Sequence, residues 1–491
     1  MLNIDKFSIK GCVAMLAAVA AVGLAACDDD DDDYTIPDVP ACQVISVSFG
    51  SDSIKAGNAY DFQLKKSGDQ TLYIWFDRNV FYDTRDASQI TTTGGLSVSE
   101  AIVPGSKSYI QVSVNIPTIN SSYSLTFPLG TVSNGQLEYS TGNVVVNFKG
   151  TNKKITIPEA PVAATSTEAI KLYNFLKDNY QTKTLSGMMA KVNWNYTNST
   201  AIGETYGKTP LLNGFDYIHM PYSENGANWI NYRDITPAKE WADKGGIVQI
   251  NWHWLFPTAA ADGDFADSYK AAVKGSNLSY EPSTVLDIDK VFTADTYENY
   301  VYELGMTTVI DYLTLLKDAK IPVLWRPYHE ASGAWFWWGQ KGATTFKKLW
   351  VDMFDRFAKA GLDNIIWVWT SQVDDIETWY PGDKYVDIVG TDTYGKDVTT
   401  HTAYFTTLST GISKIITLSE TGIGTVAHSV ADGKCAAMAS ITEQLDAGCG
   451  WSWFMPWYDS DDVAADKKHY AEEEWKAAVA DSRILWLGDY K

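Results

Sequence analysis

Cysteine is scarce in this chain of 491 residues, which contains only five. They are Cys12, Cys27, Cys42, Cys435 and Cys449. No two of them form a CxxC motif, and so small and irregular a set excludes both a disulfide-rich scaffold and a cysteine-ligated zinc site. One disulfide, between Cys435 and Cys449, stays open as an alternative. The sequence therefore predicts no metal centre.

Basic residues and long apolar runs are also in short supply. The chain has 39 Lys and Arg against 60 Asp and Glu, a formal net charge of −21. Because nucleic acids and other anionic polymers are bound by clustered Lys and Arg, the sequence excludes them as partners. Aromatic residues, by contrast, are abundant, with 19 Trp and 28 Tyr. An excess of Trp suits a protein that binds the flat apolar faces of sugars.

The N-terminal residues have the pattern of a bacterial lipoprotein signal. Lys6 and Lys10 form a positive segment before a small, apolar run from Cys12 to Ala26. This run is too short for a transmembrane helix, which needs about 20 residues. The segment Leu24-Ala25-Ala26-Cys27 resembles a lipobox. The resemblance implies that residues 1–26 are a signal peptide and that Cys27 is lipidated. An ordinary secretion signal with a chance cysteine is the alternative.

Six consecutive aspartates, Asp28 to Asp33, follow the cysteine. Like charges repel one another and cannot pack, so residues 27–40 are predicted to form a solvated acidic tether. Such a run also resembles the export signal of surface lipoproteins in some Gram-negative bacteria. The sequence thus predicts a protein that is anchored by lipid to the bacterial outer membrane and exposed at the cell surface.

Residues 41–153 have an all-β pattern. Short alternating runs, for example at 71–76 and 109–114, are typical of an immunoglobulin-like β-sandwich. The role of this accessory domain stays open between a spacer and a glycan-binding module. The aromatic residues available for the second role are Trp75, Phe76 and Tyr82. Residues 154–164 form a predicted linker.

Residues 165–491 alternate strands with helices. Thr165 is predicted to begin the first helix, with Glu168 completing a capping box. Eight strands are predicted, at 184–189, 210–217, 246–252, 322–326, 365–370, 386–390, 414–418 and 450–455. Eight strands that alternate with helices indicate an α/β fold, the (β/α)8 TIM barrel. The competing doubly wound sheet usually carries a glycine-rich phosphate loop after its first strand, which Leu185-Ser186-Gly187-Met188 does not match.

Polar and aromatic residues gather at the carboxyl ends of the predicted barrel strands. They are His253, Glu330, Asp392, Tyr394, Glu420 and Trp457. In a TIM barrel the active site lies at this face. Carboxylates are also costly to bury unless they have a function. The sequence therefore predicts an active site built from these positions.

Two of these residues, Glu330 and Glu420, suit a paired-carboxylate glycosidase. A retaining enzyme needs two carboxyls about 5–5.5 Å apart, one a nucleophile and the other an acid that later acts as a base. The acid needs an apolar surrounding that keeps it protonated, and Glu330 precedes the hydrophobic segment 333–338. Glu420 precedes the small residues Thr421-Gly422. We predict Glu330 as the acid/base and Glu420 as the nucleophile, with no cofactor.

Four motifs resemble those of one known family. WRPYHE, GAWFWWG, TDTYG and SETG, in this order, look like family 26 of the glycoside hydrolases, best known for endo-β-1,4-mannanases. The resemblance covers residues 160–491 and leaves the N-terminal β domain outside. It implies the same roles for Glu330 and Glu420 that the local chemistry predicts.

The resemblance also implies substrate contacts at five positions. These are His253, His329, Trp335, Tyr394 and Trp457. Of these, Tyr394 is expected to position the nucleophile, and Trp457 is expected to form the platform under the sugar before the scissile bond. Many members have Arg after the residue that matches Trp457, whereas this chain has Tyr458, so the details of the neighbouring subsite differ.

Arg326 and two tryptophans have supporting roles in this prediction. Arg326 is expected to brace a carboxylate by charge-assisted hydrogen bonds, without touching the sugar. Trp337 and Trp338 either line the groove or pack beneath its loop. The connection 255–290 is expected to form one wall of the cleft.

The predicted reaction is cleavage of β-1,4-mannan, glucomannan or galactomannan. The same fold and mechanism acting on β-1,3-xylan or mixed-linkage β-glucan is one alternative. A surface glycan-binding protein without catalytic activity is another, and the presence of both Glu330 and Glu420 argues against it.

Overall fold

The structure is a computed structural model. It describes residues 39–65, 68–117, 119, 121–150, 155–191, 194–282, 287–370, 376–423, 438–459 and 468–490. The predicted signal peptide, Cys27 and the aspartate run lie outside the described residues, as does Cys435. Cys449 is a buried free thiol 3.6 Å from Thr402 Oγ1. Within the described ranges, no helix is long and apolar enough to cross a membrane.

The N-terminal domain consists of two β-sheets. The larger has the strand order β2-β1-β4-β8-β7, and the smaller has the order β3-β11-β9-β6. The strands of the larger sheet are β1 (Val44–Phe49), β2 (Asp52–Lys55), β4 (Gly68–Phe76), β7 (Ser97–Ile102) and β8 (Tyr109–Ile116). Those of the smaller are β3 (Tyr60–Gln63), β6 (Thr91–Thr92), β9 (Tyr123–Pro128) and β11 (Asn143–Lys149). A separate pair joins β5 (Phe81–Tyr82) to β10 (Val132–Ser133).

Buried and exposed side chains alternate along the strands of this domain, and the buried ones form its core. In β8, Ile110, Val112, Val114 and Ile116 are buried, whereas the residues between them are partly exposed. The buried residues of both sheets form one apolar cluster, which is the arrangement of a β-sandwich. The all-β prediction for this domain is confirmed.

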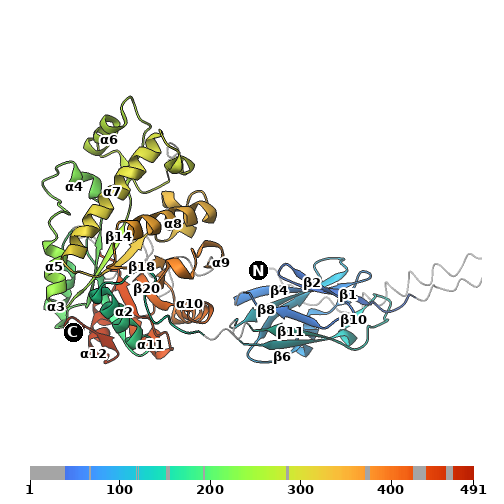
Figure 1. Cartoon of the computed structure of the whole chain (residues 1–491). Helices are drawn as coiled ribbons and strands as arrows, with labels where there is room; N and C mark the ends of the chain where they lie inside the picture. The colour runs from blue at the N-terminus through green and yellow to red at the C-terminus, as the bar shows by residue number, and fades with distance from the viewer. Residues whose placement is uncertain are drawn as a thin grey trace, which may run out of the picture.

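The C-terminal domain is a closed barrel of eight parallel strands (Figure 1). In order around the barrel they are β12 (Thr184–Met189), β13 (Leu212–Asp216), β14 (Ile247–Trp252), β17 (Val323–Pro327), β18 (Ile365–Thr370), β19 (Ile388–Tyr394), β20 (Ile415–Gly422) and β21 (Trp453–Pro456). Closure comes from β12, which pairs with both β13 and β21. The short strand β22 (Ile484–Leu485) adds to β12. The predicted TIM barrel is confirmed.

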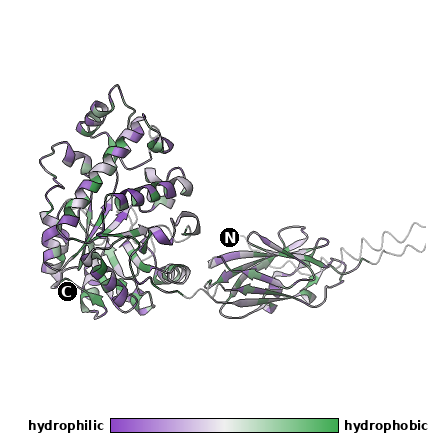
Figure 2. Ribbon diagram, viewed as in Figure 1, coloured by the Kyte–Doolittle hydropathy of each residue, from purple (hydrophilic) through white to green (hydrophobic). Residues whose placement is uncertain are grey.

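Helices surround the barrel. The longer ones are α2 (Thr167–Asn179), α3 (Thr197–Tyr206), α5 (Thr236–Asp243), α7 (Tyr297–Asp318), α8 (Ala343–Lys359), α10 (Val398–Gly411) and α12 (Glu472–Ala480). The shorter ones are α4 (Met220–Glu224), α9 (Ile376–Trp379) and α11 (Ile441–Asp446). In Figure 2 these helices carry hydrophilic residues among the hydrophobic ones. In α8, for example, Phe346, Leu349, Trp350, Met353 and Phe357 are buried, at the spacing of one helix face.

The start of the first barrel helix differs from the prediction. Ser166, not Thr165, is the N-cap of α2, and its Oγ accepts a hydrogen bond from Ala169 N at 3.2 Å. Thr165 N and Ser166 N both donate to Asp363 O. This tertiary contact holds Thr165 in the approach to the helix, so the next residue takes the capping position.

The third βα connection of the barrel carries extra structure. It contains β15 (Phe256–Pro257), α6 (Phe265–Lys274) and β16 (Leu278–Ser279), and β15 pairs with β16. Figure 1 shows α6 beyond the end of α7, away from the barrel strands. After β16 the chain returns to the barrel mouth at Tyr280, which lies beside His253 and Phe336. This return places part of the connection against the active-site face.

Candidate active site

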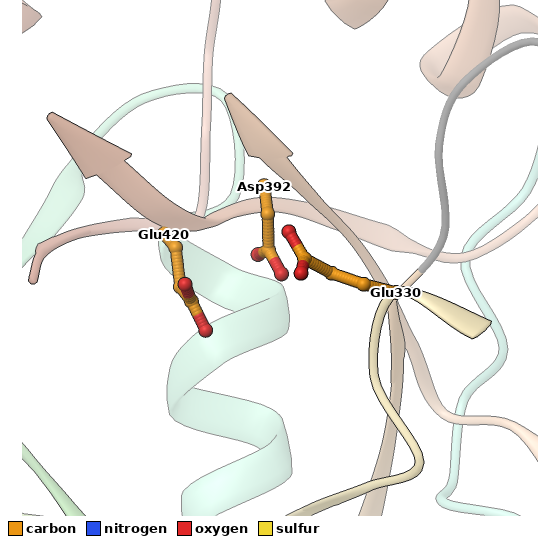
Figure 3. Close-up of side chains that lie close together, drawn as sticks. All are labelled: Glu330, Asp392 and Glu420. Atoms are coloured by element: carbon orange, nitrogen blue, oxygen red, sulfur yellow. The ribbon is translucent and has the colours of Figure 1, made fainter. Parts of the chain in front are cut away.

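Three carboxyl groups converge at the carboxyl ends of the barrel strands (Figure 3). Glu330 follows β17, Asp392 lies in β19 and Glu420 lies in β20. One oxygen from each lies within 4.8 Å of the others. Such a group has the spacing of a metal site, but Arg326 lies against two of the three carboxylates and supplies positive charge there.

Strand pairing brings Asp392 next to Glu420. The two residues are direct partners in the β19–β20 ladder, which continues through Thr393 with Thr421 and Tyr394 with Gly422. The sequence prediction ends these strands at residues 390 and 418, which is too early. Backbone pairing with the neighbouring strand continues past the polar residues, and sequence alone does not reveal this pairing.

Glu330 is positioned beside the other two carboxyls by a sharp turn of the chain and not by strand pairing. The chain after β17 turns sharply, and Tyr328, Glu330 and Ala334 all have positive φ angles, of 50°, 51° and 57°. Each such residue other than glycine costs about 1–3 kcal/mol of strain, so the surroundings must hold the turn in place. Glu330 N donates to Thr370 O at 3.2 Å, and Trp338 Nε1 donates to His329 O at 2.8 Å. Glu330, the residue with the predicted acid role, is one of these three strained residues.

Trp337 and Trp338 pack beneath this loop. Both are completely buried. Trp337 Nε1 donates to Trp254 O at 2.7 Å, and Trp338 stacks on Phe336 with ring centroids 4.5 Å apart. Of the two alternatives in the sequence analysis, the structure therefore supports packing beneath the loop.

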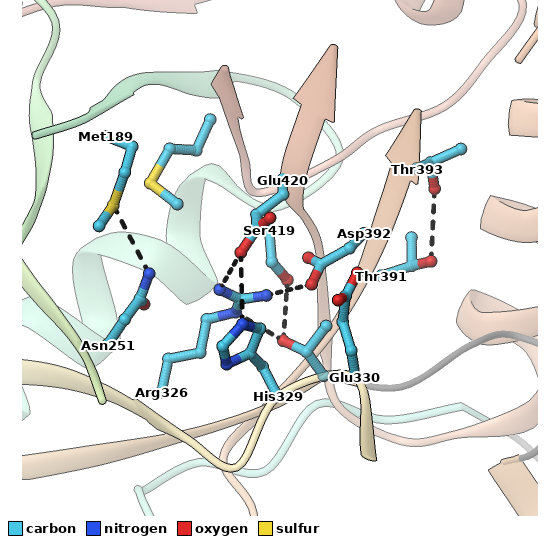
Figure 4. A network of polar contacts seen from close by, with 12 residues as sticks. Met189, Asn251, Arg326, His329, Glu330, Thr391, Asp392, Thr393, Ser419 and Glu420 are labelled. Carbon is cyan, nitrogen blue, oxygen red and sulfur yellow. Dashed lines mark hydrogen bonds and ion pairs between the residues drawn. The ribbon is translucent and has the colours of Figure 1, made fainter. Parts of the chain in front are cut away.

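Arg326 is the centre of a buried polar network (Figure 4). Its Nη1 donates to Glu420 Oε1 at 2.6 Å, its Nε donates to Thr370 Oγ1 at 2.8 Å, and its Nη2 donates to Asp392 Oδ2. The side chain is fully buried. This geometry agrees with the predicted bracing role of Arg326. The part played by Asp392 as its second partner was not predicted.

Glu420 is held at both carboxylate oxygens. Oε1 accepts from Arg326, and Oε2 accepts from the hydroxyl of Tyr394 at 2.6 Å. These two hydrogen bonds, one of them from a guanidinium, fix the orientation of the carboxylate. An oriented carboxylate at the mouth of a barrel is suited to act as a nucleophile.

Glu330 has the opposite environment. Its Oε2 accepts from Trp335 Nε1 at 2.9 Å, but no ion pair of Glu330 occurs in the described part of the chain. Burial, with the nearby charge of Glu420, raises the pKa of Glu330 to about 7, although Trp335 and Arg326 oppose the shift. Glu330 therefore keeps a proton near neutral pH, as a general acid must.

Asp392 is the third carboxyl of the cluster, and its Oδ2 is held by Arg326. Burial raises its pKa, Glu420 and Glu330 raise it further, and Arg326 opposes them. Its Oδ1 is buried and has no hydrogen-bond partner within the described ranges. Because Asp392 and Glu420 share one guanidinium and Glu330 lies nearby, the surroundings of Asp392 favour its protonated form.

Two histidines lie in contact beside the carboxyls. The rings of His253 and His329 are 4.4 Å apart between centroids, in an edge-to-face arrangement. His253 Nδ1 is 2.5 Å from Asp216 Oδ2, and its backbone N donates to Asp216 Oδ1 at 3.1 Å. His329 Nε2 lies 4.0 Å from Glu420 Oε1. Asp216, at the end of β13, was not predicted as a site residue.

The pKa values of the two rings shift in opposite directions. Burial lowers the pKa of His253, but the carboxylate of Asp216 outweighs this and the net pKa is raised. Burial, with the charges of His253 and Arg326, lowers the pKa of His329 well below its usual value. The protonated form is thus favoured at His253 and disfavoured at His329. A neutral imidazole can both donate and accept a hydrogen bond to a sugar hydroxyl, whereas an imidazolium can only donate one.

Aromatic rings surround the polar centre. Trp457 lies 5.9 Å from His253, Tyr280 lies 5.4 Å from it and Phe336 lies 5.5 Å from it, between ring centroids. Trp335 is 45% exposed. All five predicted substrate-contact residues are therefore placed around Glu330 and Glu420, and Tyr280, which was not predicted, joins them from the third connection.

We expect Asp216→Asn to lower kcat/KM at neutral pH by about 10–100-fold, the usual effect of removing a group that orients a functional histidine. Without the carboxylate, burial lowers the pKa of His253 and disfavours its protonated form. Acidification restores the imidazolium, so the deficit should shrink as the pH falls. A pH profile of kcat/KM measures this. Asp243→Asn, at an exposed ion pair with Lys239, is the control, and a deficit that is constant with pH contradicts the role.

Known proteins resemble this chain over the barrel. Glycosyl hydrolase family 26 matches residues 162–480. A mannan endo-1,4-beta-mannosidase of Thermothelomyces thermophilus is 31% identical over 315 residues, which are 63% of this chain. The chain spans 58% of the length of that relative.

Two solved structures are also similar. The family 26 domain of an endo-beta-mannanase/endo-beta-glucanase from Prevotella bryantii is 34% identical with a TM-score of 0.58, and the match covers 67% of this chain and 98% of that one. A beta-mannanase from a symbiotic protist of the termite Reticulitermes speratus, complexed with gluco-manno-oligosaccharide, is 30% identical with a TM-score of 0.57, and the match covers 69% of this chain and 99% of that one.

Proposed function

The chain belongs to glycosyl hydrolase family 26, and from this premise we propose that it hydrolyses β-1,4-mannosidic bonds with retention of configuration. The observation that carries the proposal is the pair of carboxyls Glu330 and Glu420. Their nearest oxygens lie within 4.8 Å of each other. Retaining enzymes have carboxyls about 5–5.5 Å apart, whereas inverting enzymes need about 6.5–9.5 Å to admit a water molecule.

In the first step, Glu420 attacks the anomeric carbon as Glu330 transfers its proton to the oxygen of the leaving sugar. The bond between the anomeric carbon and that oxygen breaks, and an ester forms between the sugar and Glu420. Arg326 and Tyr394 hold Glu420 in line for the attack. In the second step, Glu330, now ionised, takes a proton from water, whose oxygen displaces Glu420 from the sugar.

Mannan is the substrate class that the relatives support. The Thermothelomyces thermophilus relative is named a mannan endo-1,4-beta-mannosidase, and the beta-mannanase of the termite's symbiotic protist is complexed with gluco-manno-oligosaccharide. The Prevotella bryantii relative carries both mannanase and glucanase in its name. We therefore place mannan, glucomannan and galactomannan first, with β-1,3-xylan and mixed-linkage β-glucan as the alternative.

Release of reducing sugars from glucomannan, galactomannan, β-1,3-xylan and mixed-linkage β-glucan tests the proposal. We expect turnover of both mannans that exceeds turnover of the other two polysaccharides by at least about 100-fold, because the specificity ratio reflects contacts made in the transition state. Faster hydrolysis of xylan or mixed-linkage glucan would move the protein to the alternative substrate. Binding without product from any of the four would favour the non-catalytic glycan-binding protein.

The membrane anchor is a separate part of the proposal. Lipidation of Cys27, attachment to the outer membrane and exposure at the cell surface rest on the lipobox and the aspartate run of the sequence. The residues that carry them lie outside the described structure. An anchor of this kind would hold a polysaccharide hydrolase where an extracellular polymer is accessible.

A further inference from the structure

Three aromatic side chains form a cluster on the outer face of the five-stranded sheet of the sandwich. Tyr73 and Trp75 project from β4, and Tyr109 projects from β8, at positions that alternate with buried core residues. The ring centroids are 4.6 Å apart for Trp75 and Tyr109, 5.6 Å for Tyr73 and Tyr109, and 6.1 Å for Tyr73 and Trp75. All three side chains are partly exposed. We call this group the aromatic cluster.

The position of the central ring is fixed by its neighbours. Trp75 lies directly opposite Tyr109 in the β4–β8 ladder and opposite Ser46 in the β1–β4 ladder. Its Nε1 donates to Ser48 Oγ at 3.1 Å, and Ser48 Oγ donates to Ser53 Oγ at 2.9 Å. An aromatic platform held in this way loses little freedom when a ligand stacks on it.

The residues next to the aromatic cluster on its own strands and on β1 are polar and uncharged, and charged side chains, Lys55 opposite Ser46 and Glu100 opposite Ser113, lie one strand further out. The neighbouring outward positions on β1, β4 and β8 are Ser46, Ser48, Thr71, Gln111 and Ser113. In a chain with a net charge of −21, a neutral patch of rings and hydrogen-bonding groups matches a neutral ligand with apolar faces and hydroxyl edges. A pyranose sugar has both features, and aromatic side chains with a polar fringe suit it.

We propose that the aromatic cluster binds a neutral β-linked polysaccharide, the same class of polymer that the barrel is proposed to hydrolyse. The identity of the polymer rests on the proposed function, whereas the binding site rests on the sandwich alone. Of the three residues considered in the sequence analysis, Trp75 belongs to the site. Phe76 is 2% exposed and belongs to the core. Tyr82 packs on Phe127 with its hydroxyl buried.

The test uses the full chain carrying Glu420→Gln, so that the polymer is not consumed. Depletion from solution by insoluble mannan gives the fraction bound. We expect Trp75→Ala with Tyr109→Ala to weaken binding by about tenfold or more, since loss of a stacked aromatic anchor has an effect of this size. The barrel cleft is identical in every variant, so the difference reports the aromatic cluster.

Two further variants keep the result interpretable. Tyr139→Ala removes a tyrosine of the same domain that is 49% exposed and lies outside the aromatic cluster, and binding should remain unchanged. Tyr73→Ser leaves the Trp75–Tyr109 pair intact and should weaken binding while the thermal unfolding midpoint stays close to that of the parent. Equal binding by the parent and both cluster variants would overturn the proposal.

Hydrolysis separates this proposal from the proposed function. With Glu420 intact, the cluster variants should cleave short soluble manno-oligosaccharides at the parental rate and insoluble mannan more slowly. Absence of any hydrolysis by the parent would overturn the proposed function alone. Cluster-dependent binding to insoluble xylan in place of mannan would overturn the choice of polymer, and absence of cluster-dependent binding to either would overturn the site.

Discussion

Glu420→Gln is expected to lower kcat on mannan by about 10⁴-fold or more, the scale seen when a covalent nucleophile is removed. The amide keeps the shape of the side chain but cannot form the glycosyl ester. KM should change little, because Tyr394 and Arg326 still orient the group at this position. Steady-state reducing-sugar assays measure both constants.

A rescue experiment identifies the chemistry behind this loss. In Glu420→Ala the truncated side chain leaves room for azide, which can attack the anomeric carbon as Glu330 protonates the leaving group. A single displacement gives an α-mannosyl azide, whereas the double displacement of the parent gives β products. Failure of azide to restore turnover, or a β-configured azide product, would contradict the assignment of Glu420 as the nucleophile.

Glu330→Gln should give a loss of a different kind. Since burial raises the pKa of Glu330 to about 7, the parent should lose activity as the pH rises through this value and the acid becomes ionised. The variant should lack this alkaline limb. It should also retain the first step for aryl mannosides whose leaving group needs no protonation. The contrast between the two glutamates therefore separates the acid from the nucleophile.

Arg326→Met is the second substitution with a large expected effect, in this case on stability. The fully buried guanidinium contacts both Asp392 and Glu420. Its removal leaves buried carboxylates without a partner, which typically costs about 3–5 kcal/mol. We expect a decrease of this size in the free energy of unfolding at pH 8, measured by denaturant titration.

The loss of stability in Arg326→Met should depend on pH. Burial already raises the pKa of Asp392, and the substitution removes the arginine that opposes the shift. A carboxyl whose pKa is higher in the folded than in the unfolded state loses stability as the pH rises through that interval. The deficit of Arg326→Met should therefore be smaller at pH 5 than at pH 8. Adding Asp392→Asn should recover part of it.

A matched control lies elsewhere on the barrel. Arg356 also contacts two carboxylates, those of Glu303 and Asp352, but it is partly exposed. Solvent screens this group, so Arg356→Met should cost about 1 kcal/mol or less. An equal cost for the two arginine substitutions would show that burial of the Arg326 network contributes little to stability.

Sequence alone was sufficient to predict a β domain followed by a barrel, and to assign Glu330 and Glu420 to the same site. Runs of alternating apolar and polar residues predicted the β domain, because each of its strands buries one face only. Eight apolar strands between helices predicted the barrel, because the strands of a parallel barrel are buried on both faces. In a parallel barrel all strand ends of one kind meet at one face. Glu330 and Glu420 could therefore be assigned to one site although 90 positions separate them.

Roles that depend on a partner could not be predicted. Asp216 is an ordinary acidic residue in the printed sequence, and Asp392 was placed at the barrel mouth but without a partner. Only the neighbouring strands bring Asp216 within 2.5 Å of His253 and place Asp392 beside Glu420 on Arg326. The structure likewise decided that Trp337 and Trp338 support the loop from below, because tryptophan suits both a sugar platform and a core.

The sequence by itself determined which residue types are available at the barrel mouth, since side-chain chemistry and hydrophobic period are local properties of the chain. The tertiary structure decided their charge states and their mutual distances. The pKa of Glu330 rises because it is buried near Glu420 without an ion pair, and Glu420 is oriented because Arg326 and Tyr394 reach it from other strands. Both effects depend on burial and on separations of a few ångströms, which arise only when distant segments pack together.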